Sequence, residues 1–148
     1  FAVLEKNGEL VRINQEVDWD LEVGAIGRRT YEMEGPCLLF EKIKDYPKGF
    51  RISNGTTGTW SRVALAMGLP KDTPVREIYR RYEQGLEKKT PPRIIERDDA
   101  PCKENVMIGD EVDLYRFPSP MIHEGDGGRY IGTWDLVVCK DPETNWTN

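Results

Sequence analysis

Glycine and proline interrupt this chain at short intervals, and they limit the length of any helix or strand that it can form. Fourteen Gly and ten Pro are spread along 148 residues. Steps such as Asn7-Gly8, Gly35-Pro36 and Asp141-Pro142 mark turns, because Gly and Asn tolerate a left-handed backbone and Pro cannot continue a helix. The runs between the turns alternate irregularly between helical and strand-like patterns. We therefore expect a mixed fold of short helices and short strands, α/β or α+β.

Charge, hydropathy and cysteine content exclude several classes of protein. The chain has 21 Lys and Arg against 26 Asp and Glu, and a net charge of −5 gives little support for nucleic-acid binding. No apolar stretch approaches the roughly 20 residues that span a bilayer, and we expect no membrane span. Cys37, Cys102 and Cys139 are widely spaced and odd in number. This pattern favours a reduced, cytoplasmic protein over a disulfide scaffold, and it indicates no zinc site.

The first two-thirds of the chain contain most of the expected regular structure. We expect strands at residues 9–14, 37–40 and 50–52, and helices at residues 1–6, 21–34, 60–67 and 74–86. Asp18 or Asp20 is expected to cap the second helix, and Thr73 the fourth. Leu21, Ala25 and Ile26 are expected on one face of the second helix. The fourth helix has apolar residues at helical spacing, which predicts that they pack into the core.

Proline and charge dominate the chain after residue 88. We expect a connecting segment at residues 88–103 with at most a short strand at residues 93–96, followed by a strand at residues 106–108. An extended path is expected at residues 117–120, because a residue before Pro is disfavoured in the helical region. The clearest strand pattern covers residues 130–140, with Val137 and Val138 near its end. A turn begins at Asp141.

Three groups of residues are candidates for chemistry. His123 lies among two carboxylates and three glycines, which suits either an acid/base or metal site or a tight turn, and one histidine favours the turn. The loop at residues 54–59 lacks the Walker pattern and is interpreted as a surface loop. The amides of Asn145 and Asn148 carry hard oxygen donors of the kind that Mg²⁺ and Mn²⁺ take, although such residues are also common in turns. From these residues alone the activity is undetermined.

Several segments, read in order, resemble the UbiD family of decarboxylases. They are residues 4–13, 35–41, 60–68 and 117–131, of which the last, with its His-Glu-Gly-Asp-Gly-Gly-Arg-Tyr run, is the most specific, and the likeness continues through residues 141–148. The resemblance implies reversible, non-oxidative decarboxylation of an aromatic or α,β-unsaturated carboxylic acid. It also implies prenylated FMN, bound with a divalent metal, usually Mn²⁺, and K⁺ as cofactors.

The resemblance assigns roles to two residues. Thr133 matches a family threonine that contacts the flavin, and Asn148 matches the asparagine that binds the metal beside the flavin phosphate. Asn145 is interpreted as a turn residue. His123 matches the family's glycine-turn histidine rather than its metal ligand. No catalytic residue is expected in this chain, because the family's catalytic glutamates and remaining metal ligands match positions beyond Asn148.

The resemblance also implies an organisation into two parts. We expect an N-terminal α/β domain at residues 1–118, and the first strand of an incomplete split β-barrel flavin-binding domain at residues 119–148. Both chain ends look like cuts, so we expect the N-terminal fragment of a decarboxylase. It would work with the remainder of its chain or with companion subunits, as a cytoplasmic homo-oligomer acting on a small carboxylic acid. The alternative is a non-catalytic flavin-binding or scaffold subunit of a multi-subunit decarboxylase.

Overall fold

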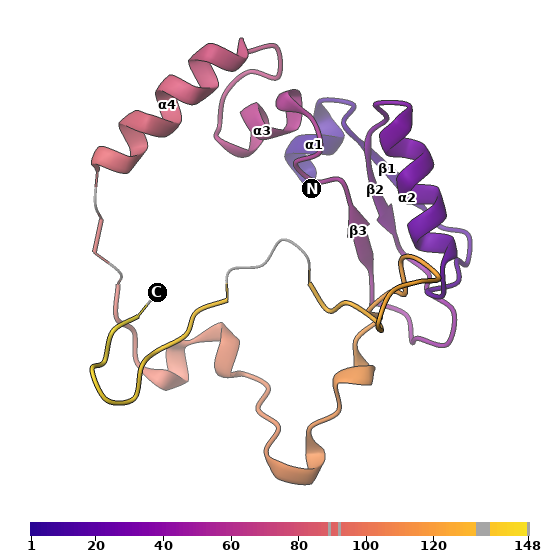
Figure 1. Ribbon diagram of the computed structural model, residues 1–148, viewed down its shortest axis with the longest axis vertical. Helices are drawn as coiled ribbons and strands as arrows, with labels where there is room; N and C mark the ends of the chain where they lie inside the picture. The colour runs from indigo at the N-terminus through magenta and orange to yellow at the C-terminus, as the bar shows by residue number, and fades with distance from the viewer. Residues whose placement is uncertain (89, 92, 133–136, 148) are drawn as a thin grey trace.

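A small sheet flanked by helices forms the N-terminal part of the chain, seen in a computed structural model that describes residues 1–88, 90–91, 93–132 and 137–147. The rest of the described chain consists of short 3-10 turns and irregular backbone (Figure 1). It leaves the helical end of the sheet, curves round and returns to the opposite end, so that the chain outlines an open ring. The structure is therefore of mixed α/β class, as the sequence predicts.

The sheet has three strands in the order β1-β2-β3. β1 (Leu10–Ile13) runs parallel to β2 (Cys37–Phe40), and β3 (Ile52–Asn54) runs antiparallel to β2. The paired residues include Leu10 with Cys37, Ile13 with Phe40, and Phe40 with Ile52. The first two strands are confirmed. The third begins later than expected, because the Phe50 N–H bonds to the Pro47 carbonyl in a turn instead of joining the sheet.

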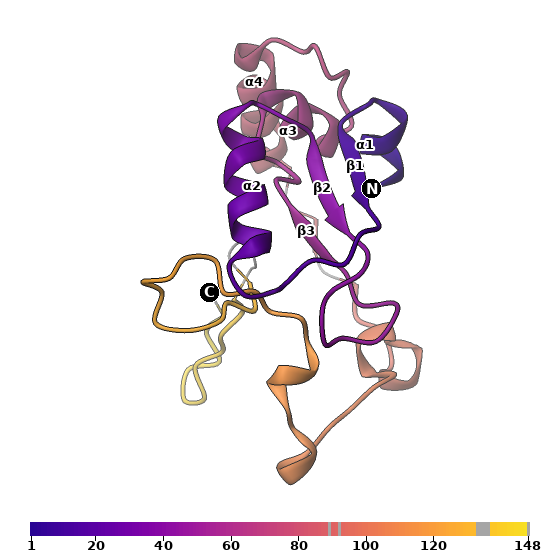
Figure 2. The same cartoon turned by 90° about the vertical axis from the view of Figure 1, so that its right-hand side faces the viewer.

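β2 is the centre of the core, and all four of its residues are buried. Side chains alternate between the faces of a strand, so Leu38 and Phe40 share one face. They form a cluster with Val23 of α2 (Glu22–Glu32), Val17 and Ile43. The other two β2 residues point the opposite way, toward α1 (Ala2–Lys6) and α3 (Trp60–Ala66), which lie across the sheet from α2 (Figure 2). Both faces of this narrow sheet are thus covered.

The start of α2 differs from the prediction. Neither aspartate caps it: Leu21 occupies the N-cap with φ 67° and makes no side-chain capping bond. The Asp18 carboxylate instead accepts the N–H of Asp20 at 3.0 Å and pairs with Lys44. The carboxylate of Glu22 turns back to accept the N–H of Asp18 at 2.6 Å. The Lys44 contact ties the loop before α2 to the β2–β3 connection, and the Glu22 bond ties the same loop to the first turn of the helix.

The buried face of α2 also differs from the prediction. Leu21 and Ala25 are exposed and Ile26 is half-buried, whereas the buried positions are Val23, Gly24 and Gly27. The two glycines allow neighbouring chain segments to approach the helix closely. The prediction is therefore wrong for Leu21 and Ala25, whereas Ile26 does pack against the core cluster beside Val23.

Helix α3 begins as predicted, with the Thr59 hydroxyl accepting the N–H of Arg62. Helix α4 (Val75–Glu87) does not begin with a Thr73 cap, because that hydroxyl donates to the Pro70 carbonyl at 2.6 Å. The prediction that the apolar face of α4 packs into the core is wrong for most of its length. Ile78 is buried, but the remaining apolar residues are exposed, namely Val75, Tyr79, Tyr82 and Leu86.

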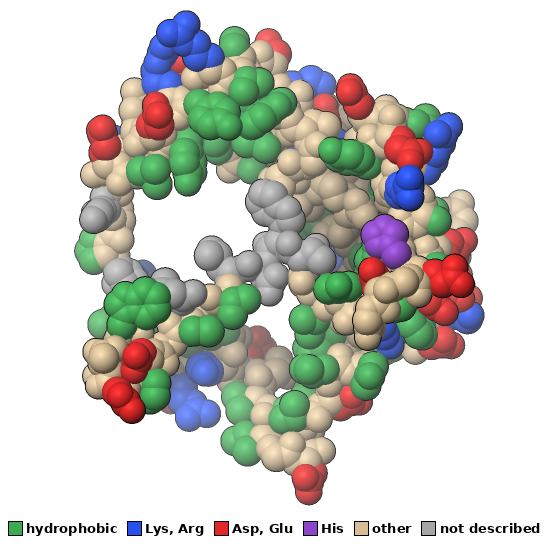
Figure 3. Space-filling view, in the orientation of Figure 1, with side chains coloured by type: hydrophobic (Ala, Val, Ile, Leu, Met, Phe, Trp, Pro, Cys, Tyr) green, Lys and Arg blue, Asp and Glu red, His purple; other side chains and the backbone are tan. Residues whose placement is uncertain are grey.

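The reason for this exposure is the position of α4. The helix projects beyond the end of the sheet, so only its beginning reaches the core (Figure 1). There the ring of Tyr79 contacts that of Trp60 in α3, with centroids 5.9 Å apart. Hydrophobic side chains gather on this face of α3 and α4 (Figure 3). Among the described residues, no helix combines the length and apolar character that crossing a membrane requires.

The segment after α4 forms no strand within its described residues. The strands expected at residues 93–96 and 106–108 are irregular backbone, and the regular pieces are 3-10 turns at Arg97–Asp99, Pro101–Lys103, Gly109–Glu111 and Leu114–Arg116. Ile94 is 93% exposed and Ile108 is 75% exposed. Strand-forming residues need a neighbouring strand to pair with, and this segment runs beside none.

Candidate functional site

The turn at residues 140–147 precedes the predicted metal ligand. Its Asp141 carboxylate accepts the N–H groups of Glu143 at 2.7 Å and Thr144 at 3.0 Å, and these bonds lower the pKa of that carboxyl. Lys140 pairs with Thr147 across the turn in antiparallel fashion. The sequence expectation of a turn that begins at Asp141 is confirmed.

Of the two predicted asparagines, only Asn145 lies in the described part of this turn. Asn145 has φ 60°, and its N–H bonds to the Asp141 carbonyl at 3.0 Å, so its interpretation as a turn residue is confirmed. Asn148 follows Thr147 directly in the sequence but lies outside the described residues. Its role as a cofactor and metal ligand stays a prediction.

Thr133, the predicted flavin contact, also lies outside the described residues, together with residues 134–136. The described parts of the predicted strand, residues 130–132 and 137–139, are irregular. Val137 and Val138 are 65% and 71% exposed. The strand prediction for residues 130–140 is therefore not met where the chain is described.

His123 lies in a tight glycine turn, as the structural interpretation predicts. Its N–H bonds to the carboxylate of Asp126 at 3.0 Å, and the Asp126 N–H bonds to the His123 carbonyl at 3.1 Å. The imidazole Nδ1 is 3.6 Å from the same carboxylate, and its side chain is 64% exposed. The histidine therefore closes a turn and is not part of a buried acid/base site.

The loop at residues 54–59 has a structural role. The N–H of Gly58 bonds to the carbonyl of Gly55, which has φ 77°, and a β-carbon at position 58 would lie 3.0 Å from Nη2 of Arg62. Arg62 is only 3% exposed and pairs with Glu9 at 3.2 Å. The glycines thus make room for a buried guanidinium, which supports the interpretation as an ordinary loop.

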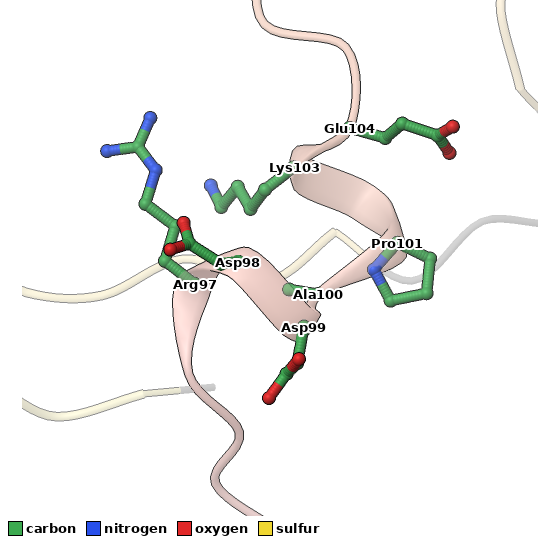
Figure 4. Close-up of a pocket in the computed structure, with 7 residues that line it drawn as sticks. All are labelled: Arg97, Asp98, Asp99, Ala100, Pro101, Lys103 and Glu104. Atoms are coloured by element: carbon green, nitrogen blue, oxygen red, sulfur yellow. The ribbon is translucent and has the colours of Figure 1, made fainter.

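One hollow lies between two 3-10 turns and measures about 540 Å³. Its walls are Arg97, Asp98, Asp99, Ala100, Pro101, Lys103 and Glu104 (Figure 4). Asp99, Pro101 and Glu104 point away from the other side chains, and all except the half-buried Ala100 are exposed. Charged groups in open water bind small ligands weakly, so this hollow is not a candidate active site.

A second hollow, of about 360 Å³, is lined by Leu114, Tyr115, Ser119, Gly128, Arg129 and Ile131. It lies where the irregular segment returns to the sheet. Its half-buried Arg129 carries a cation, with the guanidinium carbon 4.0 Å from the centre of the Trp19 ring. This corner lies just before the predicted cofactor-binding residues, which begin four positions after Arg129.

The donor chemistry limits what this chain provides for a metal. Among the described residues, no three His, Cys, Asp or Glu side chains lie close enough together to hold an ion. The one predicted metal donor is the amide of Asn148, because Thr133 is predicted to contact the flavin. An amide oxygen fits one position around a hard cation, but the rest of the coordination shell requires other groups.

Comparison with known families places the whole chain in one group. The family model described as the 3-octaprenyl-4-hydroxybenzoate carboxy-lyase N-terminal domain matches residues 1–82. The model described as the Rift-related domain of the same carboxy-lyase matches residues 93–148. The chain therefore belongs to the UbiD family, as the sequence resemblance implies.

Curated relatives with similar sequences are decarboxylases. The chain is 40% identical to pyrrole-2-carboxylic acid decarboxylase of Pseudomonas aeruginosa over 97% of its length and 30% of that protein. It is 35% identical to ferulic acid decarboxylase 1 of Candida dubliniensis over 99% of its length and 31% of that protein. The chain thus spans about 30% of the length of the curated relatives that it matches.

Solved structures show the same fold. Vanillic acid decarboxylase of Sedimentibacter hydroxybenzoicus, solved in open and closed forms, matches with a TM-score of 0.86 and 36% identity over 96% of this chain and 30% of that one. The UbiD-class enzyme HmfF of Pelotomaculum thermopropionicum, in complex with prFMN, matches with a TM-score of 0.79 and 32% identity over 99% of this chain and 32% of that one.

Sequence reasoning missed three residues that organise the described structure, namely Gly24, Arg62 and Arg129. Arg129 lies inside the family-like run, but no motif indicates that its charge is held by aromatic rings. Gly24 and Arg62 are likewise single residues without a pattern. The available signal for Arg62 is its position one turn after Thr59, at the start of a helix beside a glycine loop.

Proposed function

We propose that this chain forms the N-terminal part of a prenylated-FMN-dependent decarboxylase that acts reversibly on an aromatic or α,β-unsaturated carboxylic acid. The observation that carries the proposal is the match of two successive carboxy-lyase models to residues 1–82 and 93–148. The relatives named for pyrrole-2-carboxylic, ferulic and vanillic acids all decarboxylate an unsaturated or aromatic acid. The complex of a relative with prFMN supports the cofactor.

The chain's own contribution is to hold the cofactor. The Thr133 hydroxyl contacts the flavin, and the Asn148 amide oxygen binds Mn²⁺ or another divalent ion beside the flavin phosphate, with K⁺ nearby. Prenylated FMN, when bound, supplies an electron sink for the carbanion that loss of CO₂ leaves. The general acid and base, and the remaining metal ligands, come from the rest of the decarboxylase.

The organisation proposed for the protein follows from the same family. The N-terminal domain ends near residue 118, and residues 119–148 begin the flavin-binding domain. The complete decarboxylase is a cytoplasmic homo-oligomer. In it the N-terminal domain packs against the flavin domain and helps to close the substrate cleft.

The test uses the protein expressed from its complete reading frame and loaded with prenylated FMN and Mn²⁺. We expect a flavin absorbance band, stoichiometric metal, and CO₂ release from one of the three acids that name the relatives. Asn148→Ala should lower metal affinity by roughly 10–100-fold, since even indirect partners of a metal contribute that much. Asn145→Gly, which preserves the left-handed turn, is the matched control and should leave metal affinity unchanged.

The outcomes distinguish the two functions considered. Bound flavin with no CO₂ release from any of these acids would favour a flavin-binding or scaffold subunit. Absence of both flavin and CO₂ release would contradict the decarboxylase proposal. Equal metal affinity in Asn148→Ala and the unsubstituted protein would remove Asn148 from the metal site.

A further inference from the structure

Arg129 is enclosed by three aromatic rings from separate parts of the chain. Its guanidinium carbon lies 4.0 Å from the centre of the Trp19 ring, 5.4 Å from that of Tyr115 and 5.7 Å from that of Tyr46. Trp19 precedes α2 and Tyr46 lies in the β2–β3 connection, so two of the rings belong to the N-terminal core. We call Arg129 and these three rings the arginine clasp. A cation over aromatic faces is attracted by their quadrupoles.

Hydrogen bonds fix the guanidinium in this clasp. Nε of Arg129 donates to the Ser119 carbonyl at 2.6 Å, and Nη2 donates to the Tyr46 hydroxyl and, at 3.4 Å, to the Phe117 carbonyl. The Tyr46 hydroxyl in turn donates to the Tyr115 carbonyl at 2.8 Å. The planar fork of arginine is needed, because a single lysine nitrogen cannot reach these acceptors and stack on Trp19 at the same time.

Backbone bonds close the same junction from the other side. The Met121 N–H donates to the Trp19 carbonyl at 3.0 Å, and the Leu21 N–H donates to the Met121 carbonyl at 2.9 Å. The Tyr130 N–H donates to the Pro120 carbonyl at 3.1 Å. Residues 120–130 therefore form a loop whose two ends meet beside the N-terminal core.

The clasp holds a charge that no carboxylate neutralises. Within the described ranges, no ion pair joins Arg129 to an Asp or Glu, whereas Arg12, Arg28, Arg29, Arg62 and Arg80 each pair with a glutamate. A partly buried arginine held by rings and neutral oxygens depends on the exact geometry of those groups. Arg129 therefore holds in a fixed relative position the chain segments that supply these rings and oxygens.

We propose that Arg129 is a positioning residue for flavin binding: by filling the arginine clasp, it holds the start of the segment that follows it against the N-terminal core and sets where the flavin-contacting residues begin. This inference rests on the proposed function. Thr133 follows four positions later, and four residues of chain span at most about 14 Å. A fixed Arg129 therefore restricts the region that the Thr133 hydroxyl reaches, whereas a released one lets that segment depart from the core.

The test measures FMN affinity by fluorescence quenching in the protein expressed from its complete reading frame. Arg129→Met should weaken FMN binding by about tenfold, and Arg129→Lys by less, because the lysine keeps the cation over Trp19. Arg116→Met is the matched control. Arg116 is exposed, lies in the same segment and donates a hydrogen bond to the Met107 sulfur, outside the arginine clasp. Its substitution should therefore leave FMN affinity unchanged.

A double substitution separates positioning from general destabilisation. Trp19→Leu should weaken FMN binding on its own, and Trp19→Leu combined with Arg129→Met should be no weaker than the poorer single variant, because each breaks the same clasp. Additive losses would overturn the proposal. Far-UV circular dichroism and the melting temperature establish that each variant is folded at the assay temperature.

If Arg129→Met does not fold, Tyr115→Leu tests whether the arginine clasp contributes to FMN binding. The Tyr115 ring is 72% exposed, so its removal opens one wall of the clasp while leaving the core intact. We expect about threefold weaker FMN binding. If Arg129→Met is folded and binds FMN with unchanged affinity, the proposed role of the arginine clasp is wrong. If Arg129→Met is unfolded, unchanged FMN affinity in Tyr115→Leu leads to the same conclusion. Neither result contradicts the decarboxylase proposal. Failure of the unsubstituted protein to bind FMN would instead contradict the proposed function itself.

Discussion

Gly24 lies directly against the backbone of Ile122: a β-carbon at position 24 would stand 2.3 Å from the Ile122 carbonyl oxygen. Gly24 belongs to α2 and Ile122 to the loop that returns to the core near residue 120. The contact therefore joins the helix layer of the N-terminal domain to the segment that leads into the predicted flavin-binding residues. Only glycine permits an approach this close.

Substitution of Gly24 by alanine should consequently destabilise the protein. The obstacle is a backbone carbonyl, which cannot rotate away, so we expect a loss of about 3 kcal/mol, the upper end for overpacking. Gly85→Ala in the exposed part of α4 is the control, because a β-carbon there meets nothing within 4 Å. That change should stabilise the helix by about 0.5–1 kcal/mol. Urea denaturation measures both, and a neutral Gly24→Ala would contradict the close contact.

The buried Arg62 provides a second prediction. Its Nη1 donates to Glu9 at 3.2 Å and to the Gly35 carbonyl at 2.9 Å, which joins three parts of the N-terminal domain. Arg62→Leu leaves the Glu9 carboxylate without its nearest cation. We expect a loss of about 2 kcal/mol in the free energy of unfolding, because two bonds of a buried guanidinium are lost while the half-buried Glu9 keeps Lys71 at 3.9 Å.

The control for Arg62 is an exposed ion pair. Arg28→Leu removes the i,i+4 pair with Glu32, whose arginine side chain is 73% exposed, and should change stability by no more than about 0.5 kcal/mol. Replacing both members of the buried pair, Arg62→Leu with Glu9→Leu, should be less destabilising than Arg62→Leu alone. Denaturation curves that place the two arginine variants at equal stability would refute the prediction.

A pH dependence follows from the contact between Asp18 and Lys44. The hydrogen bond from Lys44, together with the N–H of Asp20, holds the pKa of the Asp18 carboxyl below its usual value. A carboxyl whose pKa is lower in the folded state stabilises the fold above its unfolded pKa, and this stabilisation is lost as pH falls below about 4.

Asp18→Asn should therefore flatten the decline in stability between about pH 5 and pH 2. Asp72→Asn, at an exposed site in the loop before α4, makes the same change in charge and serves as the control. Thermal melting across this pH range supplies the measurement. Identical slopes for Asp18→Asn and the unsubstituted protein would show that the Lys44 contact does not form in solution.

Two cysteines should differ sharply in reactivity. Cys37 in β2 is completely buried, and burial raises the pKa of its thiol, whereas Cys102 is exposed. Because the thiolate is the nucleophile, iodoacetamide should label Cys102 quickly and Cys37 only on unfolding. Mass spectrometry of a Cys139→Ser background gives the two rates separately. Labelling of Cys37 at the rate of Cys102 in the native protein would argue against a buried β2.

Local patterns were sufficient where neighbouring residues decide the outcome. The stop at Asn7-Gly8 and the turn at Asp141 both arise from bonds within a few residues. The apolar run of β2 was also readable, because a short run of apolar residues bounded by Gly-Pro and charged residues favours a strand buried on both faces. Family membership was readable for a similar reason, since its motifs are contiguous in the chain.

Patterns failed where distant segments decide the outcome. The apolar spacing of α4 indicates an amphipathic helix but not what covers it, and Tyr82 and Leu86 are exposed because the helix extends past the sheet. The caps predicted at Asp18 and Thr73 lost to competing partners. The Asp18 carboxylate pairs with Lys44, and the Asp18 N–H bonds to the Glu22 carboxylate. The Thr73 hydroxyl donates to the Pro70 carbonyl.

The sequence by itself determined the mixed α/β class, the central strand, the positions of turns and membership of the UbiD family. Each of these depends on residues that are neighbours along the chain. The tertiary structure alone decided that Gly24 marks the contact face of α2, that Arg62 is buried, and that Arg129 lies on Trp19. These relationships join residues more than 25 positions apart, such as Arg62 and Gly35 with a separation of 27. Close packing selects such pairs by shape and charge in three dimensions, and no local periodicity records that selection.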